Sequence, residues 1–149
     1  MRKAIQLSIE NIDKGGGPFG AIIVRNGEII AQAANSVTND NDPTAHAEVN
    51  AIRKASKKIN SFDLSDCEIY TSCEPCPMCL GAIYWSGIKT VYYGNNKQDA
   101  ANINFDDKFI YEELDKPIDK RNVKFEQLLP EEAKIAFTKW DESENKTEY

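Results

Sequence analysis

Apolar positions along the chain follow two patterns that predict two kinds of element. Apolar residues spaced three or four positions apart indicate helices, which we expect at residues 2–13, 43–59, 77–85, 107–114 and from 130 onward. Short runs rich in β-branched and aromatic residues indicate strands, which we expect at residues 19–25, 28–35, 67–72, 88–93 and, as an edge strand, 123–128. This alternation predicts an α/β protein, a three-layer α/β/α sandwich around a central sheet.

Local signals set some of the element ends. Asn26 and Gly27 lie between the first two predicted strands, and this pair is typical of a two-residue β-hairpin. A hairpin makes two strands antiparallel, so we expect a mixed sheet. Asp42 followed by Pro43 predicts the N-cap and the first residue of a helix.

The first and last helices each have an apolar side. In the first helix Ile5, Ile9 and Ile12 share one face. The last helix has a stripe that we expect to be buried, made of Ala133, Ala136, Phe137 and Trp140. The residues that follow this helix, 141–149, are polar and acidic. We expect residues 1–149 to form a single domain, with residues 141–149 as a C-terminal tail.

The charge balance disfavours some partners. The chain has 24 acidic and 18 basic residues and a formal net charge of −6, whereas nucleic acids are bound mainly through clustered lysine and arginine. No apolar stretch approaches the roughly 20 residues that span a bilayer, and the N-terminus lacks the apolar core of a signal peptide. We therefore expect a cytoplasmic protein with neither a nucleic-acid nor a membrane partner.

Closely spaced cysteines point to a metal site. Without a signal peptide, such cysteines indicate metal binding rather than disulfides. Cys76 and Cys79 are spaced so that both sulfurs can reach one ion from the first turn of a helix, and with His46 they suit Zn²⁺. Three protein ligands leave a fourth position for water, which is typical of a catalytic site. If the zinc lies off the helix's N-terminal end, Glu48 can take a proton from that water.

Other interpretations of the cysteines stay open on the residues alone. Cys73, Cys76 and Cys79 also have the C-x-x-C-x-x-C spacing of an iron–sulfur cluster. That cluster would need a fourth thiolate from Cys67, across a predicted strand, and would leave His46 without a role. A structural zinc site with Cys73 as its fourth ligand, or a zinc-binding module without catalysis, also remains open.

The chain resembles a known superfamily. The sequence His46-Ala47-Glu48 and the later sequence Pro75-Cys76-Pro77-Met78-Cys79 resemble the H-x-E and P-C-x-x-C signature of the cytidine deaminase superfamily. Residues 17–21, 41–48 and 71–79 resemble its purine branch, and residues 82–85, 105–107 and 148–149 resemble bacterial guanine deaminases within that branch. The resemblance covers nearly the whole chain. It implies a cytidine-deaminase-like fold and the zinc-dependent hydrolysis of guanine to xanthine and ammonia.

The resemblance also implies a role for each site residue. It implies one Zn²⁺ per subunit, bound by His46, Cys76 and Cys79, with Glu48 as the proton shuttle. The residues that it places against a small purine base are Asn35, Phe19, Ala47 and Trp85, with Asp107 at the amino group and Tyr149 closing the pocket. It further implies a homodimer whose subunits exchange their C-terminal segments.

Several of these residues also have simpler interpretations. Asp107 shares a face of its predicted helix with apolar residues, where a buried carboxylate needs a partner, but it can equally be the N-cap of that helix. Asn35 can be a turn residue, Phe19 and Trp85 can be core aromatics, and the tail can be a solvated chain end. The substrate can also be guanosine, cytosine or a tRNA adenosine.

Overall fold

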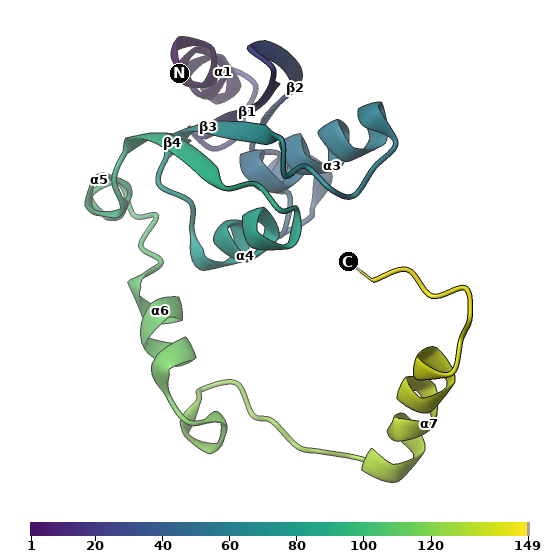
Figure 1. Cartoon of the computed structure of the whole chain (residues 1–149). Helices are drawn as coiled ribbons and strands as arrows, with labels where there is room; N and C mark the ends of the chain where they lie inside the picture. The colour runs from purple at the N-terminus through teal and green to yellow at the C-terminus, as the bar shows by residue number, and fades with distance from the viewer. Residues whose placement is uncertain (149) are drawn as a thin grey trace. The chain divides into compact units, whose positions relative to one another are not determined.

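The computed structural model describes residues 1–148 and divides the chain into two compact units (Figure 1). Unit 1 spans Met1–Lys108 and unit 2 spans Phe109–Tyr149. Unit 1 contains every strand found in the described residues, whereas unit 2 is made of helices and extended segments. None of the helices within residues 1–148 has the length and apolar character needed to cross a membrane.

Unit 1 is built on a four-stranded sheet with the order β2-β1-β3-β4. The strands are β1 (Gly20–Arg25), β2 (Glu28–Ala34), β3 (Cys67–Cys73) and β4 (Thr90–Asn95). Strand β1 is antiparallel to β2 and β3, while β3 and β4 are parallel, so the predicted mixed sheet is confirmed. Asn26 and Gly27 both have positive φ angles, 52° and 80°, as a two-residue hairpin turn requires.

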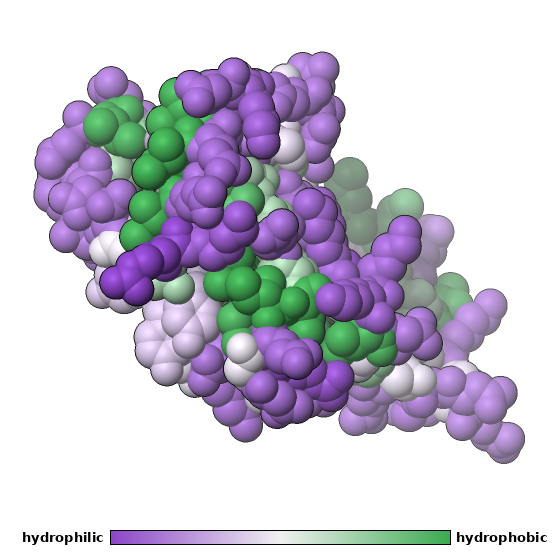
Figure 2. Space-filling model, turned by 90° about the horizontal axis from the view of Figure 1, so that it is seen from above, coloured by the Kyte–Doolittle hydropathy of each residue, from purple (hydrophilic) through white to green (hydrophobic). Residues whose placement is uncertain are grey.

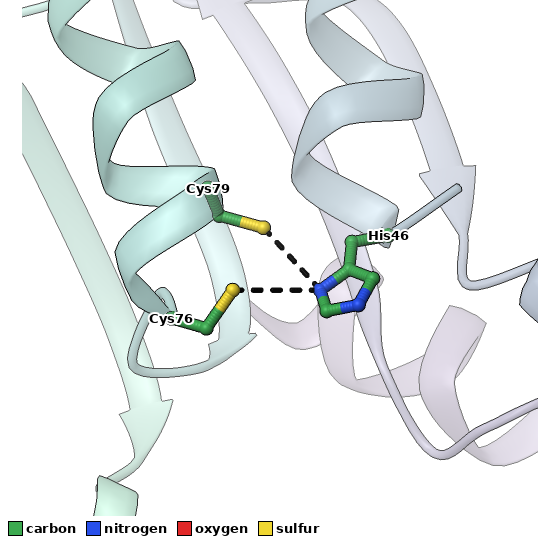
Figure 3. A group of neighbouring side chains, drawn as sticks. All are labelled: His46, Cys76 and Cys79. Atoms are coloured by element: carbon green, nitrogen blue, oxygen red, sulfur yellow. Dashed lines mark hydrogen bonds between the residues drawn. The ribbon is translucent and has the colours of Figure 1, made fainter. Parts of the chain in front are cut away.

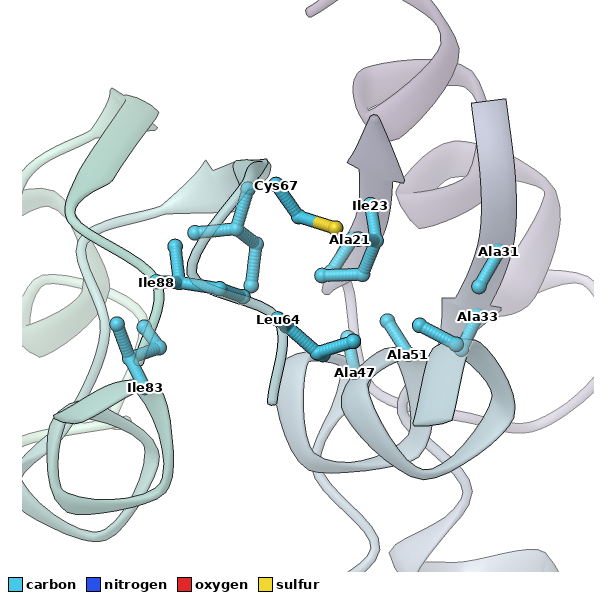
Figure 4. Packing of buried hydrophobic residues seen from close by; sticks show 12 residues of the cluster. Ala21, Ile23, Ala31, Ala33, Ala47, Ala51, Leu64, Cys67, Ile83 and Ile88 are labelled. Carbon is cyan, nitrogen blue, oxygen red and sulfur yellow. The ribbon is translucent and has the colours of Figure 1, made fainter. Parts of the chain in front are cut away.

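Helices cover both faces of the sheet. Helix α1 (Arg2–Ile12) lies on one face, where a Cβ at Gly20 would meet its backbone. Successive residues of a strand point to opposite faces, and Ala21 accordingly belongs to the core cluster on the other face. Helices α3 (Ala47–Ile59) and α4 (Pro77–Trp85) contribute to that cluster (Figure 4). The predicted three-layer α/β/α arrangement is confirmed.

Helix α1 approaches the sheet through small residues. Its buried residues are Ala4, Ser8 and Asn11, whereas the face with the three isoleucines is exposed, Ile9 by 59%. Figure 2 views the molecule from the side on which α1 lies in Figure 1, and it shows hydrophobic residues at that surface among hydrophilic ones. Close packing on a strand favours the small side chains over the isoleucine face.

Helix α3 begins later than predicted. Asp42 does not cap it; instead the Asp42 Oδ1 atom accepts hydrogen bonds from the backbone N–H and the hydroxyl of Thr44, at 2.8 and 2.7 Å. This bonding makes a local turn, and the helix starts only after His46, which is its N-cap residue. The prediction that Pro43 is the first residue of this helix was therefore wrong. The side chain of Asp42 accepts hydrogen bonds within the turn and not from the start of α3.

Two short helices were not predicted from the sequence. They are α2 (Val37–Asp40) and α5 (Lys97–Ala101). Helix α5 is fixed at its start by Asn96, whose side chain accepts from the backbone N–H groups of Gln98 and Asp99. Helices of one turn are too short to show an apolar period, so only such capping residues indicate them.

Unit 2 differs from its sequence prediction in two ways. Its elements are α6 (Lys108–Asp115, whose first residue ends unit 1), η1 (Ile118–Lys120) and α7 (Pro130–Asp141). Residues 123–128 form no strand, so the predicted edge strand was wrong. The stripe Ala133, Ala136, Phe137 and Trp140 of α7 is exposed, Phe137 by 79%, and the expected burial is not found. No described residue of unit 2 is buried, because the unit is too small and extended to form a core of its own.

We expect Gly20→Ala to lower the free energy of unfolding by about 1–3 kcal/mol, the usual cost of overpacking. A Cβ at Gly20 would lie 2.4 Å from the Ala4 carbonyl oxygen and 2.8 Å from the Ser8 backbone nitrogen, so α1 would have to move. Gly81→Ala is the matched control: nothing lies within 4 Å of its Cβ position in α4, and alanine favours the helix by about 1 kcal/mol. Urea unfolding measures both, and equal stability of the two variants would contradict this packing.

Candidate active site

Three potential ligands meet where two helices begin. His46 is the N-cap residue of α3, Cys76 is the N-cap residue of α4, and Cys79 lies in the first turn of α4. Figure 3 shows the three side chains pointing toward one another. The Nδ1 atom of His46 lies 3.6 Å from the Cys76 sulfur and 3.5 Å from the Cys79 sulfur.

These separations fit a zinc ion. With Zn–S near ~2.3 Å, Zn–N near ~2.05 Å and tetrahedral angles, a sulfur and a nitrogen ligand lie about 3.6 Å apart. The three ligand atoms all lie within 4.8 Å of one another. Two thiolates and an imidazole are a donor set that Zn²⁺ prefers, and three protein ligands leave one coordination position open. The residues predicted as zinc ligands therefore do come together with the spacing that the ion needs.

The starts of α3 and α4 explain why this cluster can hold a cation with two thiolates. Free backbone N–H groups at a helix start stabilise negative charge. The pKa of Cys76 is lowered to about 4, since it accepts a hydrogen bond from Cys79 and interacts with the ring of His46. The pKa of His46 is raised by its hydrogen bond with Cys76. The pKa of Cys79 is raised, because its thiol donates a hydrogen bond to the Cys76 sulfur and is buried.

Glu48 lies beside the cluster in the second position of α3. The residue is only 5% exposed, and burial raises the pKa of its carboxyl. Its Oε1 atom accepts a hydrogen bond of 2.9 Å from the Thr71 hydroxyl. Its Oε2 atom lies 3.4 Å from the Cys79 sulfur. His46 and Glu48 reach one place although they are two residues apart, because His46 precedes the helix and need not follow its helical spacing.

Asp107 lies immediately before α6 and is half-buried. Burial raises the pKa of its carboxyl, and the negative charge of Cys76 adds to the effect. The backbone N–H of Lys108 donates to Asp106 rather than to Asp107. The carboxyl group of Asp107 is thus within electrostatic reach of a zinc ligand, and the turn before α6 is made by its neighbour.

Three of the residues expected to contact a base are partly or fully buried within unit 1. Asn35 is buried at the end of β2, where its backbone carbonyl accepts from Asn11 at 2.7 Å and its side-chain oxygen from the Val37 backbone at 3.3 Å. Phe19 meets Phe105 edge to face, with ring centroids 5.0 Å apart. Ala47, the first residue of α3, is fully buried in the core.

Two other expected contact residues are not brought to the ligands within the described chain. Trp85 is the last residue of α4 and is 72% exposed. At 1.5 Å per residue it lies about 13 Å along the helix from Cys76. Tyr149 lies outside the described residues.

Cys67 and Cys73 are buried thiols outside the ligand group. Burial raises the pKa of each to about 11. The Cys73 sulfur lies 3.8 Å from the backbone oxygen of Asn96, and Cys67 belongs to the core cluster. This placement disfavours both the iron–sulfur cluster and the structural zinc site with Cys73 as fourth ligand.

The sequence did not point to Thr71 or Asn11. Thr71 contacts Glu48, and the side-chain amide of Asn11 donates to the backbone oxygens of both Gly17 and Asn35. A threonine in a strand and an asparagine near a helix end are common for structural reasons. Only their burial and their partners in the fold distinguish them.

The comparison with known families agrees with this geometry. The sequence model of the family described as "Cytidine and deoxycytidylate deaminase zinc-binding region" matches residues 1–95. That range includes the three ligands and Glu48. The chain belongs to this family of zinc-binding deaminases. The matched region is described as zinc-binding, and the group His46, Cys76 and Cys79 suits that ion, so the protein is a zinc-dependent deaminase.

Individual deaminases are similar to this protein over most of its chain. The guanine deaminase of Bacillus subtilis (strain 168) is 53% identical over 150 residues, which cover 100% of this chain and 96% of that protein. The X-ray structure of guanine deaminase from B. subtilis matches with a TM-score of 0.96, covering 99% of this chain and 95% of that one. The tRNA-specific adenosine deaminase of Aquifex aeolicus (strain VF5) is 38% identical over 134 residues, covering 89% and 85% of the two chains.

A solved structure in complex with 8-azaguanine is similar to a smaller part of the chain. It is 38% identical, has a TM-score of 0.68, and covers 70% of this chain and 62% of that one. Its ligand is a purine analogue, and it therefore bears on the choice of substrate below.

We expect the purified protein to hold one zinc ion per chain and Cys79→Ser to lose most of it, because a serine hydroxyl is a poor replacement for a thiolate ligand. Cys67→Ala is the matched control, since Cys67 is a buried thiol outside the ligand group and its variant should keep its zinc. Elemental analysis of the dialysed proteins measures both. Zinc retention by Cys79→Ser at the level of the unchanged protein would contradict the assigned ligand set.

Proposed function

We propose that the protein hydrolyses guanine to xanthine and ammonia. The observation that carries this proposal is the similarity to the B. subtilis guanine deaminase, which extends through unit 2 as well as through the zinc-binding region. The similar structure in complex with 8-azaguanine supports a purine base as the ligand. The open zinc site with a buried carboxylate beside it is suited to hydrolysis.

The chemistry of guanine sets what the residues must do. The amino group is on C2, and water adds to this carbon more easily if N3 is protonated as the bond forms. Zinc, when bound by His46, Cys76 and Cys79, supplies a water that ionises near neutral pH. Glu48 takes the proton from the attacking water and delivers it to N3. We assign this transfer to Oε2, because Oε1 accepts a hydrogen bond from Thr71.

The leaving group requires a second proton carrier. Ammonia leaves readily whereas amide ion does not, so the amino nitrogen must be protonated before the C–N bond breaks. This proton is the second proton of the attacking water, which is released as the new C2 hydroxyl becomes the carbonyl of xanthine. Asp107 is the carboxyl group that we assign to the amino side of the base, either as the proton carrier or as a hydrogen-bond acceptor. Its half-buried position within electrostatic reach of Cys76 supports this role.

The base itself is expected to lie between the remaining site residues. We assign Asn35 to hydrogen bonding with an edge of the ring and Phe19 to its flat face. Ala47, the further contact that the resemblance implies, is fully buried in the core next to His46 in the chain. We also keep Trp85 and Tyr149 as contacts of the base. Trp85 lies at the far end of α4 from the zinc ligands of its own chain. It can therefore contact the base only if a second copy of the chain takes part in the site.

The exposed apolar side chains of unit 2 support a homodimer that exchanges its C-terminal segments. Unit 2 buries no described residue and leaves many large apolar side chains exposed: Phe109, Leu114, Ile118, Val123, Phe125, Leu128, Leu129, Ile135, Phe137 and Trp140. Exposed apolar groups of this extent mark an interaction surface. We propose that unit 2 packs on a second copy of the chain, so that Tyr149 completes the partner's site and the two units together form the functional domain. The cytoplasmic location stays a prediction.

We expect the zinc-loaded protein to release ammonia from guanine and not from guanosine, cytosine or a tRNA anticodon stem. Glu48→Gln should keep zinc and fold but lose at least about 10²-fold in turnover, because the amide cannot carry the proton. Asp107→Asn should also keep zinc and lose most of its activity. Glu28→Gln, which changes an exposed carboxylate on β2, is the matched control and should keep full turnover.

Other outcomes of this assay identify other functions. Ammonia release from the tRNA stem alone would place the protein with the tRNA-specific deaminases and would contradict the guanine assignment. Silence on all four substrates with zinc retained would favour a zinc-binding module without catalysis. Full activity of Asp107→Asn would remove that residue from the mechanism.

We expect two inactive variants to restore each other if the tail acts in the partner's site. One variant is Glu48→Gln and the other lacks Glu148 and Tyr149. A one-to-one mixture, unfolded and refolded together, should regain about a quarter of the original activity, since half of the dimers are mixed and each has one complete site. Light scattering verifies the dimer. A mixture as inactive as its parts, or a truncated protein with full activity, would contradict the exchange.

A further inference from the structure

Thr71 is a buried residue of β3 that contacts the proposed proton shuttle. Its side chain is 0% exposed, and its hydroxyl donates a hydrogen bond of 2.9 Å to the Oε1 atom of Glu48. The bond joins the centre of the sheet to the first turn of α3. Glu48 is itself buried, so water does not replace this donor.

The sheet fixes the position of Thr71 on both sides. Thr71 is paired with Ala21 of β1 and with Tyr93 of β4. A β-branched side chain in a strand has few χ1 rotamers. The hydroxyl is therefore a fixed point in the core, held by two neighbouring strands and aimed at the glutamate.

We propose that Thr71 is a positioning residue that orients the Glu48 carboxylate for proton transfer; this inference rests on the proposed deaminase reaction. With Oε1 held by Thr71, the second oxygen is directed toward the zinc ligands, where Oε2 lies 3.4 Å from the Cys79 sulfur. A glutamate side chain otherwise has several rotatable bonds, and ordering them has an entropic cost. Thr71 fixes this geometry before the substrate binds.

The choice of donor fits this role. A lysine or arginine at this place would form a strong ion pair with the carboxylate. The oxygen that must accept the proton would then be less available. A hydroxyl adds no charge and occupies one oxygen only. Thr71 therefore orients the carboxylate through Oε1 alone and leaves Oε2 on the side of the zinc ligands, next to the Cys79 sulfur.

The alternative is that Thr71 only satisfies a buried carboxylate and thereby stabilises the fold. Thr71→Val separates the two roles, because valine keeps the shape of the side chain and removes the hydroxyl. We expect kcat on guanine to fall by about 10- to 100-fold, the usual effect of a lost charge-assisted hydrogen bond or of a misplaced catalytic group. The KM for guanine and the zinc content should change little, because Thr71 touches neither the base nor the metal ligands.

Conservative variants complete the experiment. Thr71→Ser keeps the hydroxyl and should restore most of kcat, whereas Thr71→Ala should resemble Thr71→Val. If Thr71→Val does not fold, the serine and alanine variants give the same contrast, since they differ only in the hydroxyl. Thr90→Val, in β4 of the same sheet, is the matched control and should leave kcat unchanged.

Each result decides the role. A Thr71→Val protein that keeps its kcat, or a loss that serine does not restore, would overturn the positioning role. A loss explained entirely by a lower melting temperature and lower zinc content would favour the structural alternative. If the unchanged protein acts on another of the tested substrates, the guanine assignment fails and the Thr71 series is measured on that substrate. An unchanged protein inactive on all of them would overturn both proposals.

Discussion

The site depends on the meeting of two helix starts beside one sheet. Helix α3 begins after His46 and helix α4 begins after Cys76, so both present free backbone N–H groups in the same region. These groups favour the anionic forms of thiols and carboxylates. The ligand atoms lie 3.5 and 3.6 Å apart, as one tetrahedral ion requires. Because the ligands come from two helices, a bound zinc ion also joins α3 to α4.

The core determines how close a carboxylate can come to this site. Ala47 belongs to the same hydrophobic core cluster as Ala21, Ala51 and Ile83, and the next residue, Glu48, is also buried. Burying a carboxyl group is unfavourable unless it has hydrogen-bond partners. The fold provides Thr71 from the centre of the sheet, and among the described residues no buried side-chain oxygen or nitrogen lacks a partner. The same strand thus supports the sheet and orients the group beside the zinc.

Unit 2 has the opposite character. Its helices are amphipathic or apolar on one side, yet none of its described residues is buried. Most helical stability in proteins comes from packing of such a face rather than from helix propensity. A segment of this composition is stable only against another surface, and this requirement links the proposed dimer to the proposed role of the C-terminal residues.

Much of the fold and of the metal site could be predicted from the sequence. The hairpin at Asn26-Gly27, the mixed sheet and the start of α4 at Pro77 follow from local rules on turns, apolar period and proline. The zinc ligands follow from residue types and spacing, because a tetrahedral ion with thiolate and imidazole ligands permits few arrangements. Where the local signal was ambiguous the prediction failed: Asp42 forms a turn with Thr44 and does not cap α3.

Tertiary structure decided what depends on partners far away in the chain. The isoleucine face of α1 is exposed because Gly20 admits the face with Ala4 and Ser8, and residues 123–128 form no strand because no described strand pairs with them. Thr71 and Glu48 are 23 positions apart, and only the packing of α3 on β3 brings them together. The sequence by itself determined which residues could bind zinc and which segments could be regular. The fold decided which faces are buried and how the carboxylate is oriented, since both depend on contacts between segments that no local pattern records.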